Sequence, residues 1–203
     1  MILQGIDISH HNKSVIRTYG PQWLQEKASE GFVIMKATEG QTWLDPMYPS
    51  YVDMIGEQLI LSRQVQTGFY HYARPENNTP QEEVDNFLGA VSEFVGVSLL
   101  ALDVEGRALE CPNVGEWVYE WLKLVKRKTG VKPVVYCQRS ALKKFDLAAA
   151  NDYGLWLASW TKSKPAKIEP WEIMALWQYK GIGIDEDYFF GSPEQWRLYA
   201  RSK

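Results

Sequence analysis

The sequence predicts an α/β fold, a single β/α barrel of about eight strands whose last helices are shortened or missing. Strand-like apolar runs alternate with helical segments as far as about residue 130, and such alternation is typical of a parallel sheet. Beyond Pro133, four more strand-like runs follow with little helix between the last three. Eight strands is the number that closes a sheet into a barrel. The 203 residues contain no repeat, low-complexity tract or linker, so we expect residues 1–203 to form one domain.

The first four expected strands are short apolar runs bounded by turn residues, at residues 5–9, 32–37, 67–72 and 99–102. A helix is expected over residues 21–30, with Pro21 in its first turn and Gly31 just beyond its end. Residues 45–63 are mixed and are expected to be helical in their second half.

Two more helices are expected in the middle of the chain. Thr79-Pro80-Gln81-Glu82 has the form of a capped helix start, and this helix is expected to run to about Val95. Asn113 is expected to cap a long helix that ends near residue 130 and buries Trp117 and Trp121 on one stripe. The later strands are expected at residues 134–137, 155–158, 175–179 and 185–189.

Composition excludes several classes of partner. A net charge of −3 leaves no electrostatic footprint for nucleic acid. No apolar run approaches the roughly 20 residues of a membrane span, and residues 1–5 lack signal-peptide features, so we expect a soluble protein made in the cytoplasm. A monomer is expected as well. The two cysteines form neither a disulfide framework nor a metal cluster, and Cys137 is interpreted as a buried inert thiol. Nine tryptophans and eleven tyrosines would suit either a large core or a sugar-binding cleft.

Asp103 and Glu105 form the most informative motif. They follow the apolar run 99–102 at spacing i, i+2, and side chains two apart on a strand share one face, roughly 6.5–7 Å apart. Neighbouring carboxyl groups push each other's pKa apart, and this allows one to act as an acid while the other stays ionised. Taken alone, the motif fits a strand that frays into a polar loop equally well.

Other polar side chains end the remaining strands, and active groups of β/α barrels lie at the C-terminal ends of strands. These side chains are Asp7, Lys36, Glu39, His71, Arg74, Trp160, Gln178, Asp185 and Asp187. Because the first and last strands of a closed barrel are neighbours, we expect Asp7 and Asp185 to lie close together. Several carboxylates with aromatic residues, without a nucleophile signature, favour glycosidic bond chemistry.

Substrate contacts are expected from Tyr70 and Tyr72, which share one face of their strand while His71 takes the other. Trp160 and Gln178 are further candidates, and Trp177 is as well explained by the core. Lys36 and Glu39 are candidates too, with a structural ion pair at the mouth as the alternative. Arg74, before Pro75, is interpreted as a structural loop residue.

Six motifs resemble, in order, those of glycoside hydrolase family 25, the Chalaropsis-type lysozymes common among phage endolysins and bacterial autolysins. They lie at residues 5–9, 35–40, 68–72, 102–105, 155–158 and 177–179 and cover nearly the whole chain. The resemblance implies a flattened barrel with five β/α units and a β-rich end. It also implies hydrolysis of the β-1,4 bond between N-acetylmuramic acid and N-acetylglucosamine in peptidoglycan. We expect no cofactor, and the sequence shows no separate cell-wall-binding domain.

By motif position, the resemblance implies that Glu105 is the general acid, Asp103 its partner, and Asp7 and Asp185 two further active-site aspartates. The leaving glycosidic oxygen must be protonated, so the acid needs a raised pKa. In a substrate-assisted variant, Asp103 would orient the N-acetyl group that attacks. The chain departs from the family in having Asp187 where Asn is common, which leaves open whether Asp185, the favoured choice, or Asp187 faces the site.

Two other functions remain open from the sequence. A carbohydrate-binding protein on the same barrel would need the cleft but not four carboxylates. A metal-dependent polysaccharide deacetylase would use the tandem His10-His11 with Asp7, but only His71 remains as a further histidine ligand. The resemblance to endolysins favours action on the bacterial cell wall after phage or prophage lysis, or after non-classical export.

Overall fold

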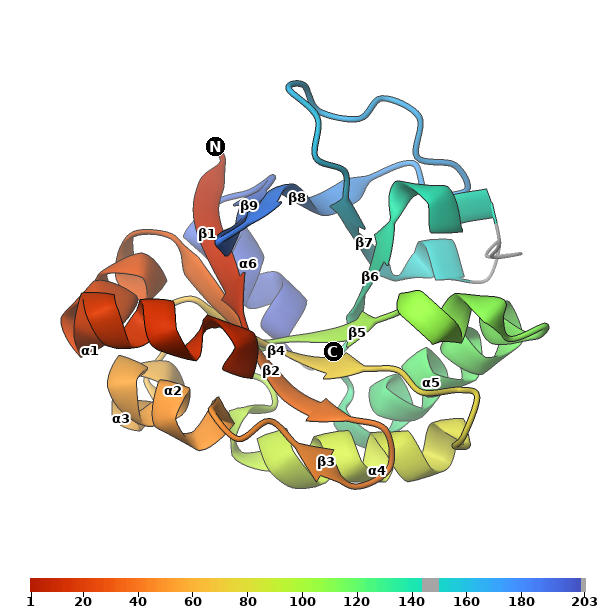
Figure 1. Cartoon of the computed structure of the whole chain (residues 1–203), viewed down its shortest axis with the longest axis horizontal. Coiled ribbons are helices and arrows are strands. Elements are labelled where there is room, and N and C mark those ends of the chain that lie inside the picture. Colours follow the sequence, from red (N-terminus) through yellow and green to blue (C-terminus); the bar gives the residue numbers. More distant parts are fainter. Residues whose placement is uncertain (144–149, 202–203) are drawn as a thin grey trace.

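The structure, a computed structural model, describes residues 1–143 and 150–201. Within these residues, eight strands close into one barrel in the order β1-β9-β8-β7-β6-β5-β4-β2, and pairing of β1 with β2 completes the ring (Figure 1). The strands are β1 (Leu3–Ile8), β2 (Phe32–Glu39), β4 (Thr67–Tyr72), β5 (Leu99–Asp103), β6 (Val134–Gln138), β7 (Gly154–Ala158), β8 (Met174–Ile182) and β9 (Ile184–Phe189). The predicted single barrel of eight strands is therefore confirmed.

The sheet is mixed, whereas alternation of strands and helices had predicted a parallel one. Strand β9 runs antiparallel to both β8 and β1. Only Gly183, with φ of 85°, separates β8 from β9, and a parallel crossover needs a dozen or more residues. As a result, the start of β9 lies at the same end of the barrel as the C-terminal ends of the other strands.

The described helices are α1 (Lys13–Glu30), α2 (Tyr48–Ile55), α3 (Glu57–Leu61), α4 (Pro80–Val91), α5 (Val114–Thr129) and α6 (Pro193–Ala200). Helices α1 to α5 lie along the side of the barrel formed by β1 to β6, and α6 lies behind the barrel in the view of Figure 1. Gly20 breaks α1 at φ of 81°, so Pro21 begins its second part as expected. Thr79 and Glu82 form the expected capping box of α4, but Asn113 makes no side-chain cap hydrogen bond to α5.

Four helices or strands were not expected from the sequence. Helix α2 lies mainly in the first half of residues 45–63, whereas helix was expected only in the second half, where α3 lies. The first part of α1, residues 13–19, begins in a polar cluster without a clear apolar stripe. The short strand β3 (Trp43–Leu44) pairs antiparallel with the end of β2, and it is exposed. Helix α6 follows the last strand, and Ser192 caps it through a capping box with Gln195.

Two apolar layers hold the barrel together. The outer layer lies between strands and helices and includes Trp121 and the fully buried Cys137, as predicted. The inner layer fills the barrel near the N-terminal ends of the parallel strands. There Trp196 of α6 stacks on Phe32, with ring centroids 4.6 Å apart, and donates to the Thr67 carbonyl oxygen at 3.3 Å. Helix α6 therefore closes this end, and the polar mouth lies at the other.

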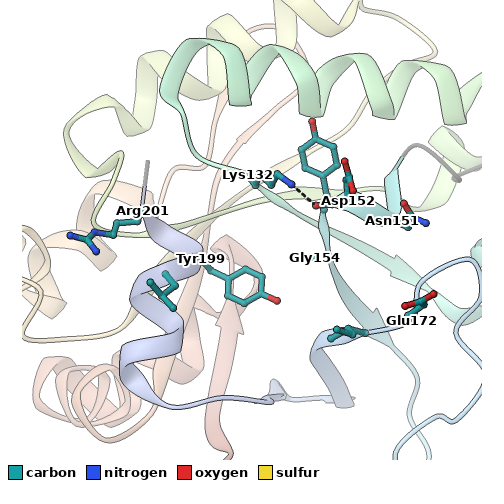
Figure 2. A pocket seen from close by; sticks show the side chains of 10 residues that line it. Lys132, Asn151, Asp152, Gly154, Glu172, Tyr199 and Arg201 are labelled. Atoms are coloured by element: carbon teal, nitrogen blue, oxygen red, sulfur yellow. Dashed lines mark hydrogen bonds between the residues drawn. The ribbon is translucent and has the colours of Figure 1, made fainter. Parts of the chain in front are cut away.

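A cavity of about 630 Å³ lies outside this closed end, at the starts of β6, β7 and β8 and against α6 (Figure 2). Its lining includes positive and negative side chains together with an aromatic one: Lys132, Asp152, Glu172, Tyr199 and Arg201. It is remote from the C-terminal ends of the strands and holds none of the predicted site residues. In the described part of the chain, no helix has the length and apolar character needed to cross a membrane.

Candidate active site

Asp103 and Glu105 lie side by side at the end of β5. The backbone stays extended through Glu105, at φ of −148° and ψ of −176°, while Val104 is buried on the opposite face. The chain then turns at Gly106, with φ of 55°. A Cβ at this position would lie 2.9 Å from the Tyr72 hydroxyl, so a residue with a side chain would be both strained and crowded here. The glycine therefore allows the strand to end directly after its second acid.

The environments of the two acids differ. Asp103 is 7% exposed, and its Oδ1 has no hydrogen-bond partner. Burial, and then the charge of Glu105, hold the pKa of Asp103 well above its usual range. Glu105 is half-buried, and burial raises its pKa while Lys36 opposes the shift. Glu105 is thus the more accessible of the two carboxyl groups, and its raised pKa favours the protonated form.

Asp7 and Asp185 face this pair from the other side of the mouth. Their Cα atoms are direct partners in the β1–β9 ladder, as expected for the first and last strands of a closed barrel. Burial, followed by the charge of Asp185, raises the pKa of Asp7 to about 7. Burial also raises the pKa of Asp185. The mouth therefore concentrates acidic groups that resist ionisation.

Asp185 and Asp187 both face the interior, because residues two apart on β9 share a face. Asp185 is partly exposed at the rim, whereas Asp187 is completely buried one step deeper. The indole Nε1 of Trp156 donates to Asp187 Oδ1 at 2.7 Å. The two aspartates thus occupy two depths of the same wall.

Gln178 connects the floor of the mouth to its rim. Its Nε2 donates to Asp7 Oδ2 at 2.8 Å, and its Oε1 accepts from the Tyr136 hydroxyl and from Trp160 Nε1, both at 3.1 Å. Trp160 is 62% exposed, although its ring lies so close to Gly181 that a Cβ there would be 2.2 Å from it. The protein therefore fixes a largely exposed indole at the rim.

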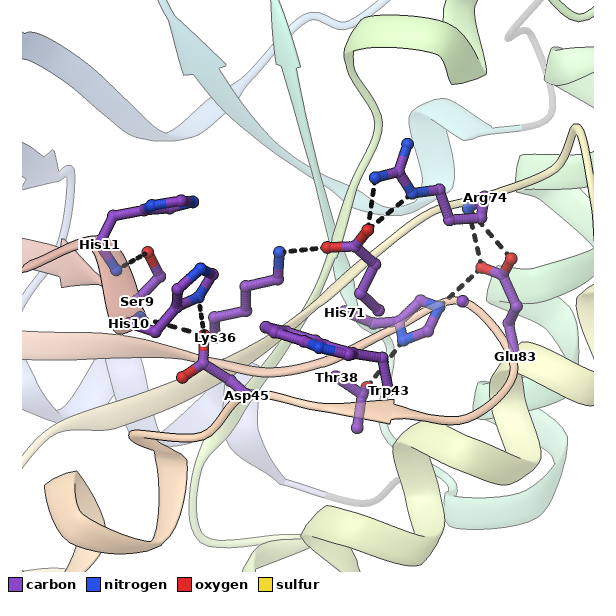
Figure 3. Close-up of polar contacts among 12 residues, drawn as sticks. Ser9, His10, His11, Lys36, Thr38, Trp43, Asp45, His71, Arg74 and Glu83 are labelled. Carbon is purple, nitrogen blue, oxygen red and sulfur yellow. Dashed lines mark hydrogen bonds and ion pairs between the residues drawn. The ribbon is translucent and has the colours of Figure 1, made fainter.

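Lys36, Glu39 and Arg74 form a chain of charges at the mouth (Figure 3). Lys36 Nζ lies 2.6 Å from Glu39 Oε2, and Arg74 Nε donates to Glu39 Oε1 at 2.7 Å. The Lys36 ammonium also lies 4.5 Å from the ring centroid of Tyr72. Lys36 and Glu39 thus form the ion pair weighed as an alternative to substrate contact, and Arg74 supports it from the loop.

Tyr70 and Tyr72 are on the inner face of β4, and His71 is on the outer face. Tyr70 is buried within the inner apolar layer, and Tyr72 is half-buried near Gly106. Trp177 lies in the outer layer and donates to the Ser159 carbonyl oxygen at 2.7 Å, so it is a core residue. Of the aromatic candidates, Trp160 presents the largest exposed surface.

His71 belongs to a buried polar cluster behind the mouth (Figure 3). Its Nε2 lies 2.7 Å from Glu83 Oε2, and its Nδ1 lies 2.8 Å from Thr38 Oγ1. Burial lowers the pKa of His71, so the neutral ring donates from Nε2 to Glu83 and accepts from Thr38. Glu83 also accepts from the backbone N–H of Arg74 at 3.0 Å. The cluster thus fastens the loop that carries Arg74.

The tandem histidines lie beside β3. His10 Nδ1 is 2.8 Å from Asp45 Oδ2, and the ring of His11 packs on that of His10 with centroids 3.9 Å apart (Figure 3). Within residues 1–143 and 150–201, no three His, Cys, Asp or Glu side chains are arranged to hold a metal ion.

Sequence reasoning did not single out Tyr136, Trp156 or Glu83. Strand alternation carries a signal for the first two, because Tyr136 lies two residues after Val134 and Trp156 two before Ala158, all on the inner face. Glu83 lies in an acidic run of α4, and no local pattern distinguishes it from its solvent-exposed neighbours.

A closed β/α barrel with several carboxyl groups gathered at the C-terminal ends of its strands suits an enzyme that cleaves glycosidic bonds. Residues 6–187 match the family described as Glycosyl hydrolases family 25, and the chain belongs to this family. The resemblance seen in the six motifs is thereby confirmed, and the chain is a glycoside hydrolase.

Related proteins come from bacteria and fungi. Uncharacterized protein YegX of Escherichia coli O157:H7 is 27% identical, over 98% of this chain and 73% of the relative. The autolytic lysozyme of Clostridium acetobutylicum is 31% identical, over 66% of this chain and 39% of the relative. The N,O-diacetylmuramidase of Chalaropsis sp is 26% identical, over 87% of each chain.

Solved structures share the fold. The muramidase from Trichobolus zukalii superposes with a TM-score of 0.76 at 23% identity, covering 99% of this chain and 100% of its own. The bacterial lysozyme from Streptomyces coelicolor gives 0.78 at 22% identity, covering 98% and 96%.

Proposed function

We propose that this protein is a lysozyme, an N-acetylmuramidase that hydrolyses the β-1,4 bond between N-acetylmuramic acid and N-acetylglucosamine in peptidoglycan. The observation that carries the proposal is the meeting of the Asp103–Glu105 pair with Asp7 and Asp185 at one mouth. Relatives named autolytic lysozyme and N,O-diacetylmuramidase support the choice of substrate. A binding protein without catalysis would gain nothing from four acids that oppose one another's ionisation.

Glu105 is the general acid in this proposal. Its proton passes to the glycosidic oxygen as the bond from that oxygen to the sugar C1 breaks, so the leaving chain departs as a neutral alcohol. Glu105 is then a carboxylate, and it takes a proton from the water that attacks C1 in the second half of the reaction. This restores the acid, and one water is consumed for each bond cleaved. Its raised pKa and its partial exposure both suit this role.

Asp103 orients the substrate's N-acetyl group. In a substrate-assisted route the acetyl oxygen attacks C1 and forms a cyclic intermediate, which water then opens. The amide N–H of that group needs an acceptor, and the buried Asp103 Oδ1 has none of its hydrogen-bonding capacity used. Asp7 and Asp185 supply negative charge near the sugar as positive charge develops there.

The remaining candidates form the substrate-binding surface. Trp160 offers its exposed indole face to a sugar ring, and Gln178 holds it in place. Tyr72 lines the inner wall, the buried Tyr70 supports that wall from within the inner apolar layer, and Lys36 and Glu39 place a pair of opposite charges beside it. The enzyme acts as a monomer on glycan strands and uses no cofactor.

A digest of purified peptidoglycan tests the proposal. Wild-type protein is expected to reduce the turbidity of the suspension and to release new reducing ends on N-acetylmuramic acid, whereas Glu105→Gln is expected to do neither. Glu110→Gln is the matched control, because Glu110 is exposed at the end of the same loop. A folded wild-type protein that releases no reducing ends would refute catalysis, and ends on N-acetylglucosamine would indicate a glucosaminidase.

A further inference from the structure

Asp187 is buried among the site residues without an obvious role. It is 0% exposed and lies opposite Gly5 of β1 and Gln178 of β8. Trp156 Nε1 donates to its Oδ1, but its Oδ2 meets no donor. A buried carboxylate oxygen without a donor lowers the free energy of unfolding, so a partner is expected for Oδ2.

The neighbour is a second carboxyl group. In the β1–β9 ladder Asp187 lies opposite Gly5 and Asp185 lies opposite Asp7, so Asp7 and Asp187 are diagonal neighbours on the inner face. Gly5 places no side chain between them, and the two carboxyl groups are close enough to influence each other's ionisation. The other groups facing Asp187 are Asp185 on β9 and Tyr136 on β6, and neither supplies positive charge. Two carboxyl groups can share a hydrogen bond only when one of them carries a proton.

The surroundings decide which carboxyl group holds that proton. Asp7 receives a second hydrogen bond, from Gln178 Nε2 at 2.8 Å, and this stabilises its charged form. Asp187 is deeper in the barrel and has the single indole donor at its other oxygen. The negative charge therefore resides on Asp7 and the proton on Asp187.

We infer that Asp187 is a positioning residue of the active site, a neutral carboxylic acid that donates from Oδ2 to Asp7 and fixes the Asp7 carboxylate in the mouth. Burial, and then the charge of Asp7, keep the pKa of Asp187 well above its usual range. An asparagine fits the same two partners, since its Oδ1 would accept from Trp156 and its Nδ2 would donate to Asp7. The use made of Asp7 in catalysis rests on the proposed function.

Two neutral variants of similar shape test this role. Asp187→Asn keeps a donor toward Asp7, whereas Asp187→Leu has none. At pH 7 the Leu variant is expected to show kcat/KM at least about tenfold below that of the Asn variant, as for loss of a hydrogen bond to a charged group. The acid limb of its pH profile is expected at higher pH, because the Asp7 carboxylate loses a stabilising donor. Equal rates and equal profiles in the two variants would overturn the inference.

A second measurement keeps the inference testable if the Leu variant fails to fold or if the wild type proves inactive. Carboxyl ¹³C NMR of wild-type protein, with Asp187 assigned through the Asn variant, reports the protonation of each aspartate directly. Asp187 is expected to remain protonated at the pH at which Asp7 ionises, near pH 7. An ionised Asp187 at pH 7 would refute the inference. A protonated Asp187 in a protein that cleaves no glycan would refute the proposed function alone.

Discussion

Replacement of Glu83 by leucine tests the polar cluster that lies behind the mouth. Glu83 is 0% exposed and accepts hydrogen bonds from three donors: His71 Nε2 at 2.7 Å, the Arg74 backbone N–H at 3.0 Å and Asn78 Nδ2 at 2.9 Å. Leucine has a similar volume but accepts no hydrogen bond. All three donors would therefore lose this acceptor between β4 and α4.

The expected loss of stability follows from these contacts. An unsatisfied buried donor costs about 1–3 kcal/mol. The neutral His71 ring is fully buried and bears this cost in full, while the part-buried Arg74 N–H and Asn78 Nδ2 each add less. We therefore expect Glu83→Leu to lower the free energy of unfolding by about 3–5 kcal/mol. In a domain of this size, each kcal/mol lowers Tm by about 2–4 °C, which gives a total of about 6–20 °C.

Urea unfolding followed by tryptophan fluorescence measures the loss, and calorimetry gives Tm. Glu83→Gln is the matched control, because its amide oxygen can still accept from Arg74 and Asn78, and it is expected to lose less than half as much. His71→Phe combined with Glu83→Leu is expected to cost less than the sum of the single changes, because the pair then becomes apolar. A Glu83→Leu protein within 1 kcal/mol of wild type would refute the reasoning.

Three further predictions concern the mouth. Glu105→Gln is expected to lower the rate of hydrolysis about 10²–10⁴-fold, yet to unfold at a higher temperature than wild type at pH 8. Burial raises the pKa of the Glu105 carboxyl group in the folded protein, so the wild type loses stability as rising pH ionises this group. The glutamine amide does not ionise and avoids this loss. Equal melting temperatures at pH 8 would contradict the prediction. Lys36→Met is expected to move the alkaline limb of the activity profile to higher pH, because Lys36 lowers the pKa of Glu105, and a shift to lower pH would count against it. Trp160→Ala is expected to raise KM about fivefold, roughly 1 kcal/mol of stacking, and Trp160→Phe to raise it less; equal KM values would remove Trp160 from the substrate surface.

Local patterns in the sequence predicted the features that depend on local physics. The apolar run ahead of Asp103 and the two-residue period of strands were enough to place Asp103 and Glu105 on one face at a strand end. Closure of the barrel then predicted that Asp7 and Asp185 are neighbours, and the ladder pairs them directly.

Contacts that depend on tertiary register were beyond the reach of the sequence. Glu83 stands in a run of acidic residues, and its burial follows from meeting His71, which the outer face of β4 presents to α4. The contact of Asp187 with Asp7 likewise depends on β9 running antiparallel to β1. Helix α6, in contrast, carried a local signal that was missed, because Ser192, Pro193 and Gln195 repeat the pattern of Thr79, Pro80 and Glu82 at the start of α4. Only its role in closing the barrel end through Trp196 depends on the tertiary structure.

The antiparallel strand β9 also has a consequence for the biogenesis of the enzyme. Asp7 is in the first of the described strands, and Asp185 and Asp187 are in the last, so nearly the whole barrel lies between them in the sequence. Pairings between such distant segments form late in folding, because the entropy cost of closing a long loop must be met before the strand contacts can stabilise the chain. Until β9 inserts, β1 and β8 each present an unpaired edge, which favours aggregation. The same strand that closes the barrel therefore also brings Asp185 and Asp187 to the mouth beside Asp7, and under the proposed function hydrolysis is expected only after β9 has paired.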